Sequence, residues 1–110
     1  MKKLILAGLL IALSSVAVFA DTFTLKNGTG SYTFYELYIS YNHSDDWGPE
    51  QLGDGVMGPG QSGTVNVPVS LNSVTIDITI VDEDDDTYTI YGKRVRNGGT
   101  VTITLDDLDD

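Results

Sequence analysis

Five carboxylic acids stand side by side at positions 82–86, between two segments that are predicted to be strands. Adjacent carboxylates repel one another, so water and salt, a basic neighbour or a metal ion must offset the repulsion. Calcium binds six to eight oxygen atoms, many of them from carboxylates. Asp82, Asp84 and Asp86 occupy every second position, as the first ligands of a calcium-binding loop do. The run is therefore the sharpest candidate for a metal site.

The helix-loop-helix calcium motif is excluded, because its twelfth position, counted from Asp82, is Lys93 and no helices flank the run. A β-sandwich can instead hold calcium between loops at one end. If strands at 22–26, 32–41, 64–69 and 74–81 run alternately up and down, the 42–62 loop and the acidic run leave the same end, with Asp54 also nearby. The predicted calcium ligands are Asp45, Asp46, Asp82, Asp84 and Asp86.

Two alternatives stay open for the acidic run. It can be a solvated hairpin that keeps the protein soluble. One more or one fewer strand within the 42–62 loop would also place the two acidic loops at opposite ends of the domain. The calcium assignment therefore depends on the path of that long loop.

Catalytic activity has little support in the sequence. The chain has no cysteine, one histidine (His43), no Gly-x-Ser-x-Gly turn and no glycine-rich phosphate loop. We therefore expect a protein that is not an enzyme, with a small hydrolase as the alternative. The single tryptophan, Trp47, can stack on a sugar ring or a partner, but its expected role is to anchor the long loop.

The beginning of the chain predicts export. Two lysines, Lys2 and Lys3, precede an apolar run that ends at Ala20 after small residues, as in a cleaved signal peptide over residues 1–20. An uncleaved membrane anchor is the alternative. Residues 21–110 are then one domain, expected to be secreted or periplasmic and not inserted in a membrane.

The charge of the exported part limits its partners. The whole chain has a formal charge of −10, and loss of the two lysines makes it −12. The electric field of such a negative charge repels nucleic acids and anionic lipids, and it attracts cations and basic partners. No disulfide can form, because there is no cysteine, so sheet hydrogen bonds, packing or a bound ion must stabilise the domain.

Alternating apolar residues predict the elements that position these groups. Val74, Ile76, Ile78 and Ile80 alternate with polar or smaller residues, and similar patterns recur along the chain. This predicts an all-β fold, an antiparallel β-sandwich of immunoglobulin-like architecture with six or seven short strands, or alternatively a small barrel. Residues 32–41 carry aromatics on both faces, which predicts a central strand.

Turn and tail signals complete the expected arrangement. Asn27-Gly28 and Asn97-Gly98-Gly99 are typical of hairpins. The acidic run at 106–110 is expected to be a frayed, solvated tail, although Leu108 can tuck back onto the core.

Short motifs spread over residues 27–86 resemble small secreted bacterial β-sandwich domains, a family of largely uncharacterised proteins. The motifs are Asn27-Gly28-Thr29-Gly30, Leu37-Tyr38-Ile39-Ser40, Trp47-Gly48, Leu52-Gly53, Pro59-Gly60 and Asp77-Ile78 before the acidic run. The resemblance implies a β-sandwich and export, and it transfers no catalytic residue.

The sequence thus predicts an exported, non-enzymatic binding module that uses calcium at its acidic end. Its partner is expected to be a protein or a glycan. The alternative is a structural or assembly subunit of the cell envelope that interacts through its sheet edges.

Overall fold

The computed structural model describes residues 20–110, so the predicted signal peptide, apart from Ala20, lies outside the described residues. Within them, six strands and two short 3-10 helices follow one another. The strands are β1 (Asp21–Asn27), β2 (Phe34–Tyr41), β3 (Ser62–Val67), β4 (Ile76–Asp82), β5 (Thr87–Lys93) and β6 (Thr100–Ile103). The 3-10 helices are η1 (Leu71–Ser73) and η2 (Leu105–Asp107).

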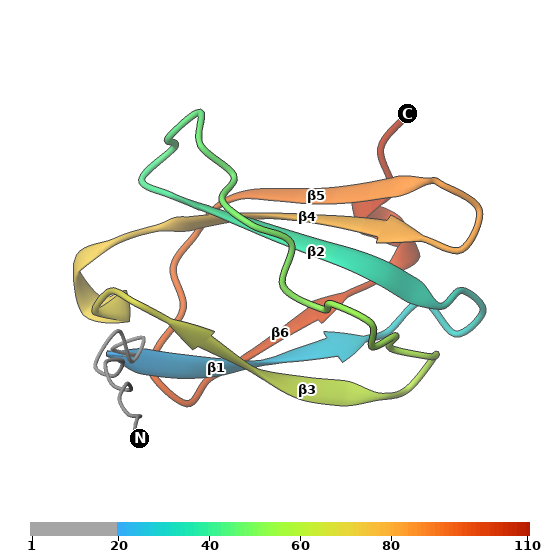
Figure 1. The fold of residues 1–110 in the computed structure, drawn as a ribbon, viewed down its shortest axis with the longest axis horizontal. Coiled ribbons are helices and arrows are strands. Elements are labelled where there is room, and N and C mark those ends of the chain that lie inside the picture. The colour runs from blue at the N-terminus through green and yellow to red at the C-terminus, as the bar shows by residue number, and fades with distance from the viewer. Residues whose placement is uncertain (1–19) are drawn as a thin grey trace, which may run out of the picture.

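Two three-stranded sheets pack face to face, as Figure 1 shows. One has the order β3-β1-β6 and the other the order β2-β4-β5. The predicted all-β fold is confirmed at this level. The expectation of a purely antiparallel sandwich is wrong in one place, because β1 and β6 pair in parallel.

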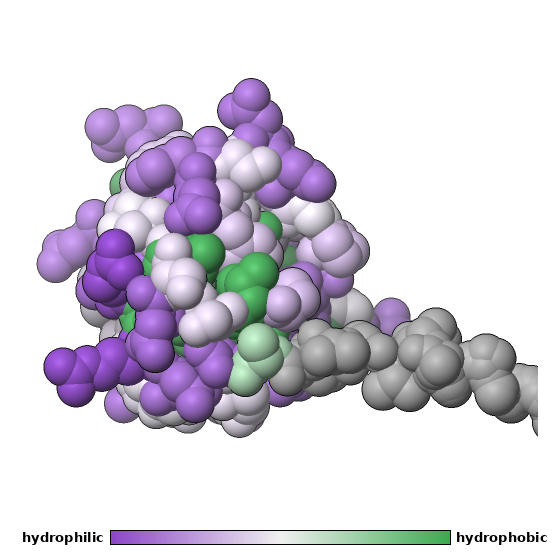
Figure 2. Space-filling model, turned by 90° about the vertical axis from the view of Figure 1, so that its left-hand side faces the viewer, coloured by the Kyte–Doolittle hydropathy of each residue, from purple (hydrophilic) through white to green (hydrophobic). Residues whose placement is uncertain are grey.

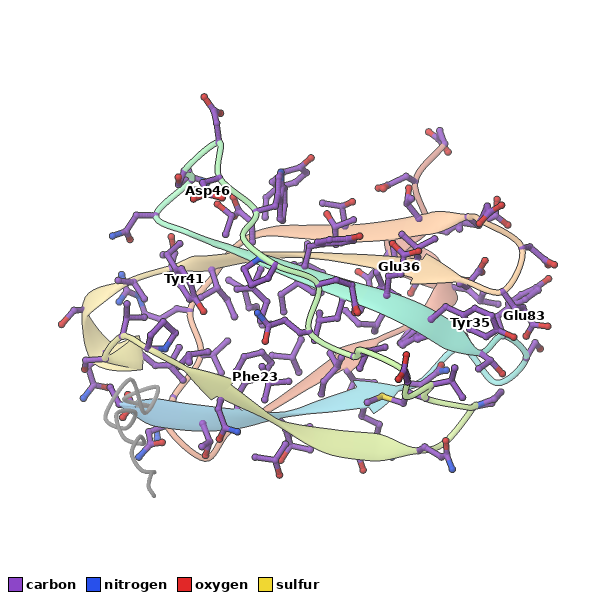
Figure 3. The ribbon with its side chains drawn as sticks, viewed as in Figure 1. Phe23, Tyr35, Glu36, Tyr41, Asp46 and Glu83 are labelled. Atoms are coloured by element: carbon purple, nitrogen blue, oxygen red, sulfur yellow. The ribbon has the colours of Figure 1, made fainter. Side chains whose placement is uncertain are left out.

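The core lies between the sheets and follows from residue alternation. Ile76, Ile78 and Ile80 of β4 point inward and are fully buried. They meet Phe23 and Leu25 of β1, which come from the opposite sheet; Figure 3 labels Phe23 between the two layers. Because every second residue of a strand faces the same way, the intervening residues of β2, β4 and β5 form the outer face of their sheet.

Strand β2 is the edge of its sheet, so the prediction that it is central is wrong. The register shifts between Phe34 and Glu36, and this bulge buries Phe34 while leaving Tyr35 half exposed. The following long segment runs back along the free edge of β2, where the backbone of Met57 exchanges two hydrogen bonds with that of Phe34. The segment therefore satisfies part of the backbone of this edge.

The returning segment also decides where the acidic loops lie. The segment crosses the length of the sandwich once more, as an additional strand would. Strands β2 and β4 are therefore antiparallel, with Tyr41 opposite Ile76 and Phe34 opposite Asp82. The loop after β2 and the 82–86 turn therefore leave opposite ends of the sandwich (Figure 1). The prediction that they emerge together is wrong.

The end that carries the 42–49 loop has a mainly hydrophilic surface with small hydrophobic patches, as Figure 2 shows. Among residues 20–110, only the 82–86 turn joins two neighbouring strands of one sheet. The segments at Asn27-Gly28 and at 97–99 both cross between the sheets, so the hairpin predictions there are wrong. No helix within residues 20–110 is both long and apolar enough to span a membrane.

The acidic C-terminus is not a frayed tail. Leu108 forms a bridge with Tyr88, and the backbone N–H of Asp109 donates to the carbonyl of Thr87 over 2.8 Å. The Asp109 carboxylate accepts hydrogen bonds from the hydroxyls of Thr87 and Thr89. The tail therefore pairs with the free edge of β5 and covers the beginning of that edge.

Candidate ligand-binding site

The five residues predicted to hold calcium do not surround a common point. Asp45 and Asp46 are exposed in the loop after β2, and Asp84 and Asp86 are exposed at the opposite end of the sheet. In the described part of the chain, no three or more His, Cys, Asp or Glu side chains are arranged to hold a metal ion. Calcium binding at either acidic loop separately stays a prediction.

The first carboxylate of the acidic run, Asp82, is used inside the protein. It is only 1 % exposed. Its Oδ1 accepts the backbone N–H groups of Asp84 and Asp86 over 2.9 and 3.0 Å, and its Oδ2 accepts the Tyr88 hydroxyl over 2.7 Å. Asp82 is therefore the hydrogen-bonding centre of the turn, and its carboxylate is shielded from solvent.

The repulsion in the acidic run is offset by hydrogen bonds rather than by basic side chains. Glu83 accepts the backbone N–H of Thr33 over 2.8 Å and so ties the turn to the neighbouring 28–33 segment. Asp84 is exposed. Its pKa is raised, first because the neighbouring chain displaces part of its hydration and second because Asp82 and Glu83 are negatively charged. Asp85 has a φ of 63°, as expected for the left-handed residue that closes a three-residue hairpin loop.

An open groove on the outer face of the β2-β4-β5 sheet is the candidate binding site, because three of its four lining residues are aromatic. Tyr38 of β2, Thr79 of β4, Tyr91 of β5 and Trp47 of the long loop line it, and its volume is about 440 Å³. Tyr38 and Thr79 are opposite each other in the ladder, and Tyr91 is 70 % exposed. Exposed aromatic side chains gathered in one place are typical of binding surfaces.

The groove floor is made of hydroxyl groups that already have partners. The Thr79 hydroxyl lies 3.4 Å from that of Thr89, its neighbour across the ladder. The Tyr38 hydroxyl donates to Glu36 over 2.7 Å. The hydrogen bond to Glu36, followed by burial, raises the pKa of Tyr38, so its hydroxyl stays neutral and fixed in direction.

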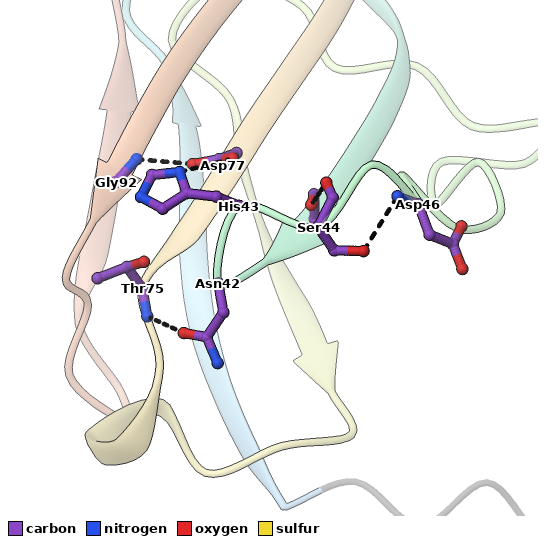
Figure 4. Close-up of polar contacts among 8 residues, drawn as sticks. Asn42, His43, Ser44, Asp46, Thr75, Asp77 and Gly92 are labelled. Carbon is purple, nitrogen blue, oxygen red and sulfur yellow. Dashed lines mark hydrogen bonds and ion pairs between the residues drawn. The ribbon is translucent and has the colours of Figure 1, made fainter.

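The segment that carries Trp47 is held by a series of local hydrogen bonds, several of which Figure 4 shows. Asn42 and His43 both have positive φ, and Ser44 N–H donates to the Tyr41 carbonyl, which closes a tight turn. The buried Ser40 hydroxyl then donates to the Ser44 carbonyl over 2.5 Å.

A second turn directly flanks the tryptophan. The Ser44 hydroxyl accepts the N–H of Asp46 over 3.1 Å, and the Asp46 carboxylate accepts the N–H of Gly48 over 2.8 Å. Gly48 has a φ of 66°, which glycine adopts without strain. Asp46, labelled in Figure 3, thus has a structural role, because its turn spans Trp47 and fixes how that residue leaves the loop.

His43 and Asp77 fasten the turn to the sheet. His43 Nδ1 lies 3.3 Å from Asp77 Oδ2, and within residues 20–110 this is the only such close contact between a basic and an acidic side chain (Figure 4). Asp77 is buried, and its other oxygen accepts the N–H of Gly92 over 2.7 Å. The imidazole leans on Gly92, where an added Cβ would lie 3.3 Å from it. His43 therefore positions the groove wall and touches no nucleophile that the structure describes.

Glu50 anchors the other side of the long loop. Its carboxylate accepts the N–H groups of Leu37, Leu52 and Gly53 over 2.9, 2.5 and 2.7 Å. Burial alone would raise the pKa of Glu50, but the backbone N–H groups outweigh it and hold the pKa below 4.5, the ordinary value. One carboxylate thus satisfies the edge of β2 and the loop that returns along it.

Glu50→Gln is expected to make the free energy of unfolding depend less on pH between pH 3 and pH 7. Because the pKa of Glu50 is lower in the folded protein, its contribution is complete above about 4.5 and is lost as the pH falls through the lowered value. The variant is expected to lose roughly 1 kcal/mol of unfolding free energy at pH 7 and less at pH 3. Urea denaturation from pH 3 to 7 measures this.

The matched control is Asp54→Asn, which removes an exposed carboxylate from the same loop and leaves Glu50 in place. It is expected to keep the stability of the parent at every pH. An equal loss at pH 3 and pH 7 in Glu50→Gln would contradict the assignment of this pH dependence to Glu50.

A second, more enclosed cavity of about 160 Å³ lies between β3 and the returning segment. Leu37, Leu52, Met57 and Val65 contribute to it, and no charged side chain lines it. It therefore offers apolar packing space at the sheet margin and little chemistry of its own.

Sequence reasoning named Trp47 but missed Tyr38 and Tyr91 as its companions. The signal was present in the alternation: Tyr38, Thr79 and Tyr91 all fall on the strand positions that face away from the core. Adjacency of β2, β4 and β5 was the missing information, because it brings the three positions together. No family model matches the chain, and neither a curated protein nor a solved structure was found that matches it.

Proposed function

We propose that this protein is an exported, non-enzymatic binding module that recognises a glycan through the aromatic groove. The observation that carries the proposal is the gathering of Tyr38, Trp47 and Tyr91 around one open groove of about 440 Å³. Aromatic faces stack on the apolar face of a sugar ring and lose little conformational entropy in doing so. Export, an immunoglobulin-like architecture and the resemblance to small secreted β-sandwich domains belong to this same proposal.

The rigidity of the groove supports binding over catalysis. Trp47 leaves a loop held by the Asp46 and Ser44 turns, and Tyr38 is oriented by Glu36. A pre-organised surface of this kind reduces the entropy cost of binding. The one hydroxyl–carboxylate pair described at the groove is Tyr38 with Glu36, and the raised pKa of Tyr38 keeps that hydroxyl protonated. His43 is paired with Asp77.

Removal of an aromatic wall is expected to weaken binding at least tenfold, because buried aromatic contacts dominate such interfaces. Trp47 is the only tryptophan, so its fluorescence reports on the groove directly. The parent protein and Tyr91→Ala are to be titrated with two β-1,4-linked tetrasaccharides, one of N-acetylglucosamine and one of glucosamine. Trp47→Ala lacks the fluorescent residue, so its binding of the same ligands is to be measured by calorimetry.

Tyr35→Ala is the matched control. Tyr35 is half exposed and belongs to the same sheet, but it lies near the opposite end, beside Glu83, as Figure 3 shows. It is expected to bind like the parent. Absence of binding to every oligosaccharide, or equal losses in Tyr35→Ala and Tyr91→Ala, would overturn the groove assignment. Calcium chloride added to the same titrations tests the calcium prediction separately.

Assembly through sheet edges is the second candidate, and it is favoured by the two edges of the β3-β1-β6 sheet, β3 and β6. The segment at 50–57 covers part of the edge of β2, and residues 108–109 cover part of that of β5. Strand β3 pairs with β1 on one side, and its other side borders the 160 Å³ cavity. Light scattering at micromolar concentration distinguishes the two candidates, because assembly requires species larger than the monomer.

A further inference from the structure

Carboxylates lie beside Tyr38 on one side of the aromatic groove. Glu36 accepts the hydrogen bond of Tyr38 over 2.7 Å. After that hydrogen bond and burial, the charges of Glu36 and Glu50 also raise the pKa of Tyr38, so both lie close enough to impose a negative potential on it. Asp46 directly precedes Trp47 and is exposed. The site therefore combines aromatic faces with negative charge.

Basic side chains mostly lie elsewhere. Lys26 belongs to β1 in the other sheet, and Arg94 donates to a backbone carbonyl of η1 at the end of the sandwich. Arg96 stands before the turn whose Gly98 N–H donates to β1. Lys93 is the one basic residue close to Tyr91 in the chain, two positions further along β5. Negative groups thus outnumber positive ones beside the groove.

The groove combines the donors of the Trp47 indole and the Tyr91 hydroxyl with the carboxylate acceptor that Glu36 provides beside Tyr38. Carboxylates only accept, and the Tyr38 hydroxyl spends its proton on Glu36. An ammonium group is the complement of this carboxylate, because it donates three hydrogen bonds and accepts none. Aromatic faces attract cations as well, with Trp the strongest of them. An anionic sugar meets repulsion from the charge of −12 on residues 21–110.

We propose that the groove selects amino sugars with a free ammonium group, the ring stacked on the aromatic side chains and the ammonium directed toward Glu36. This inference rests on the proposed glycan-binding function and adds the charge of the ligand to it. N-acetylated sugars present the same ring without the positive charge, so they bind more weakly at the same place.

The test compares two probes with the same rings and linkage, the β-1,4 tetrasaccharides of glucosamine and of N-acetylglucosamine, at pH 6, where the free amines are protonated and the acetylated ones carry no charge. Titration followed by Trp47 fluorescence is expected to give about tenfold tighter binding of the glucosamine tetramer. Glu36→Gln is expected to bring the ratio of the two affinities close to one, because the amide oxygen can still accept the Tyr38 hydrogen bond but the side chain carries no charge. Asp106→Asn removes one charge from an exposed residue of η2 that does not line the groove, and it is expected to keep the preference.

Each other outcome has a distinct meaning. Equal or tighter binding of the acetylated tetramer, with both lost in Tyr91→Ala, overturns the charge selectivity and leaves the glycan-binding function standing. Binding of neither tetramer overturns both. Binding of the glucosamine tetramer that survives Tyr91→Ala and Trp47→Ala in calorimetry, but disappears in 0.5 M salt, reveals non-specific attraction of a cationic chain and overturns the assignment to the groove.

Discussion

Replacement of Asp82 by alanine is expected to lower the free energy of unfolding by about 3–5 kcal/mol, because three donors lose their acceptor at once. These are the N–H groups of Asp84 and Asp86 and the hydroxyl of Tyr88. Tyr88 is fully buried, and its ring packs against Phe34 with centroids 5.6 Å apart, so its hydroxyl cannot turn to water. Such a loss is a large share of the 5–15 kcal/mol that stabilises a typical small domain.

Urea denaturation followed by circular dichroism measures the effect. Asp82→Asn is the graded variant: its amide oxygen still accepts the two N–H groups, and its loss is expected to be about 1–2 kcal/mol. Asp86→Asn is the control, because Asp86 is exposed in the same run and its removal only relieves repulsion. If Asp82→Ala unfolds at the same urea concentration as Asp86→Asn, Asp82 is a surface charge and not the centre of the turn.

Tyr88→Phe separates the two halves of this network. It removes only the hydroxyl, so the buried Asp82 keeps its two backbone donors and loses one partner. Burial first, and then the hydrogen bond to Asp82, raises the pKa of Tyr88, so its hydroxyl remains a donor throughout the ordinary pH range. A double-mutant cycle with Asp82→Ala then gives the coupling energy of the pair.

Alternation located the six strands but could not choose their neighbours. It specifies which face of a strand is buried, whereas pairing depends on which strands meet. Hence β4, the most regular apolar strand, is central in its sheet. The aromatic β2 is an edge strand, and the segment at 50–57 covers part of its free edge. The same segment carries no apolar alternation of its own, which is why sequence reasoning treated it as a loop and placed both acidic loops at one end.

The acidic run shows that the alternation of inward and outward residues, continued to the last residue of a strand, also identifies a buried polar residue. Asp82 continues the inward series of Ile76, Ile78 and Ile80, so the pattern assigns it to the buried face. A buried carboxylate requires donors, and the turn supplies them from its own backbone. The run is therefore one structural residue followed by exposed ones rather than five equivalent ligands.

Asn27 is a comparable case in which a turn signal concealed a buried side chain. Sequence reasoning assigned Asn27-Gly28 to a hairpin, but Asn27 is fully buried. Its Nδ2 donates to the carbonyls of Tyr32 and Met57 over 2.7 and 2.9 Å, and its Oδ1 accepts both the N–H and the hydroxyl of Thr29. The residue therefore joins three segments: the end of β1, the crossing to β2 and the chain that covers the edge of β2.

Asn27→Asp is expected to cost about 3–5 kcal/mol of unfolding free energy at pH 7, although it changes the side chain by one atom. A carboxylate cannot donate, so it faces the carbonyl oxygens of Tyr32 and Met57 in a site without water access. Asn66→Asp makes the same change at an exposed position of β3 and is expected to stay within about 0.5 kcal/mol of the parent.

The Met57 contact extends this effect to the groove. Met57 pairs with Phe34 at the free edge of β2, and the same returning segment continues from the loop that carries Trp47. Loss of the Asn27 hydrogen bond should therefore loosen residues 50–57 first, and amide hydrogen exchange is expected to quicken there in Asn27→Asp under conditions in which β4 stays protected. Uniform acceleration over both sheets would instead show that Asn27 stabilises the whole sandwich without a local role, and an exchange pattern like that of Asn66→Asp would show that its four hydrogen bonds contribute nothing.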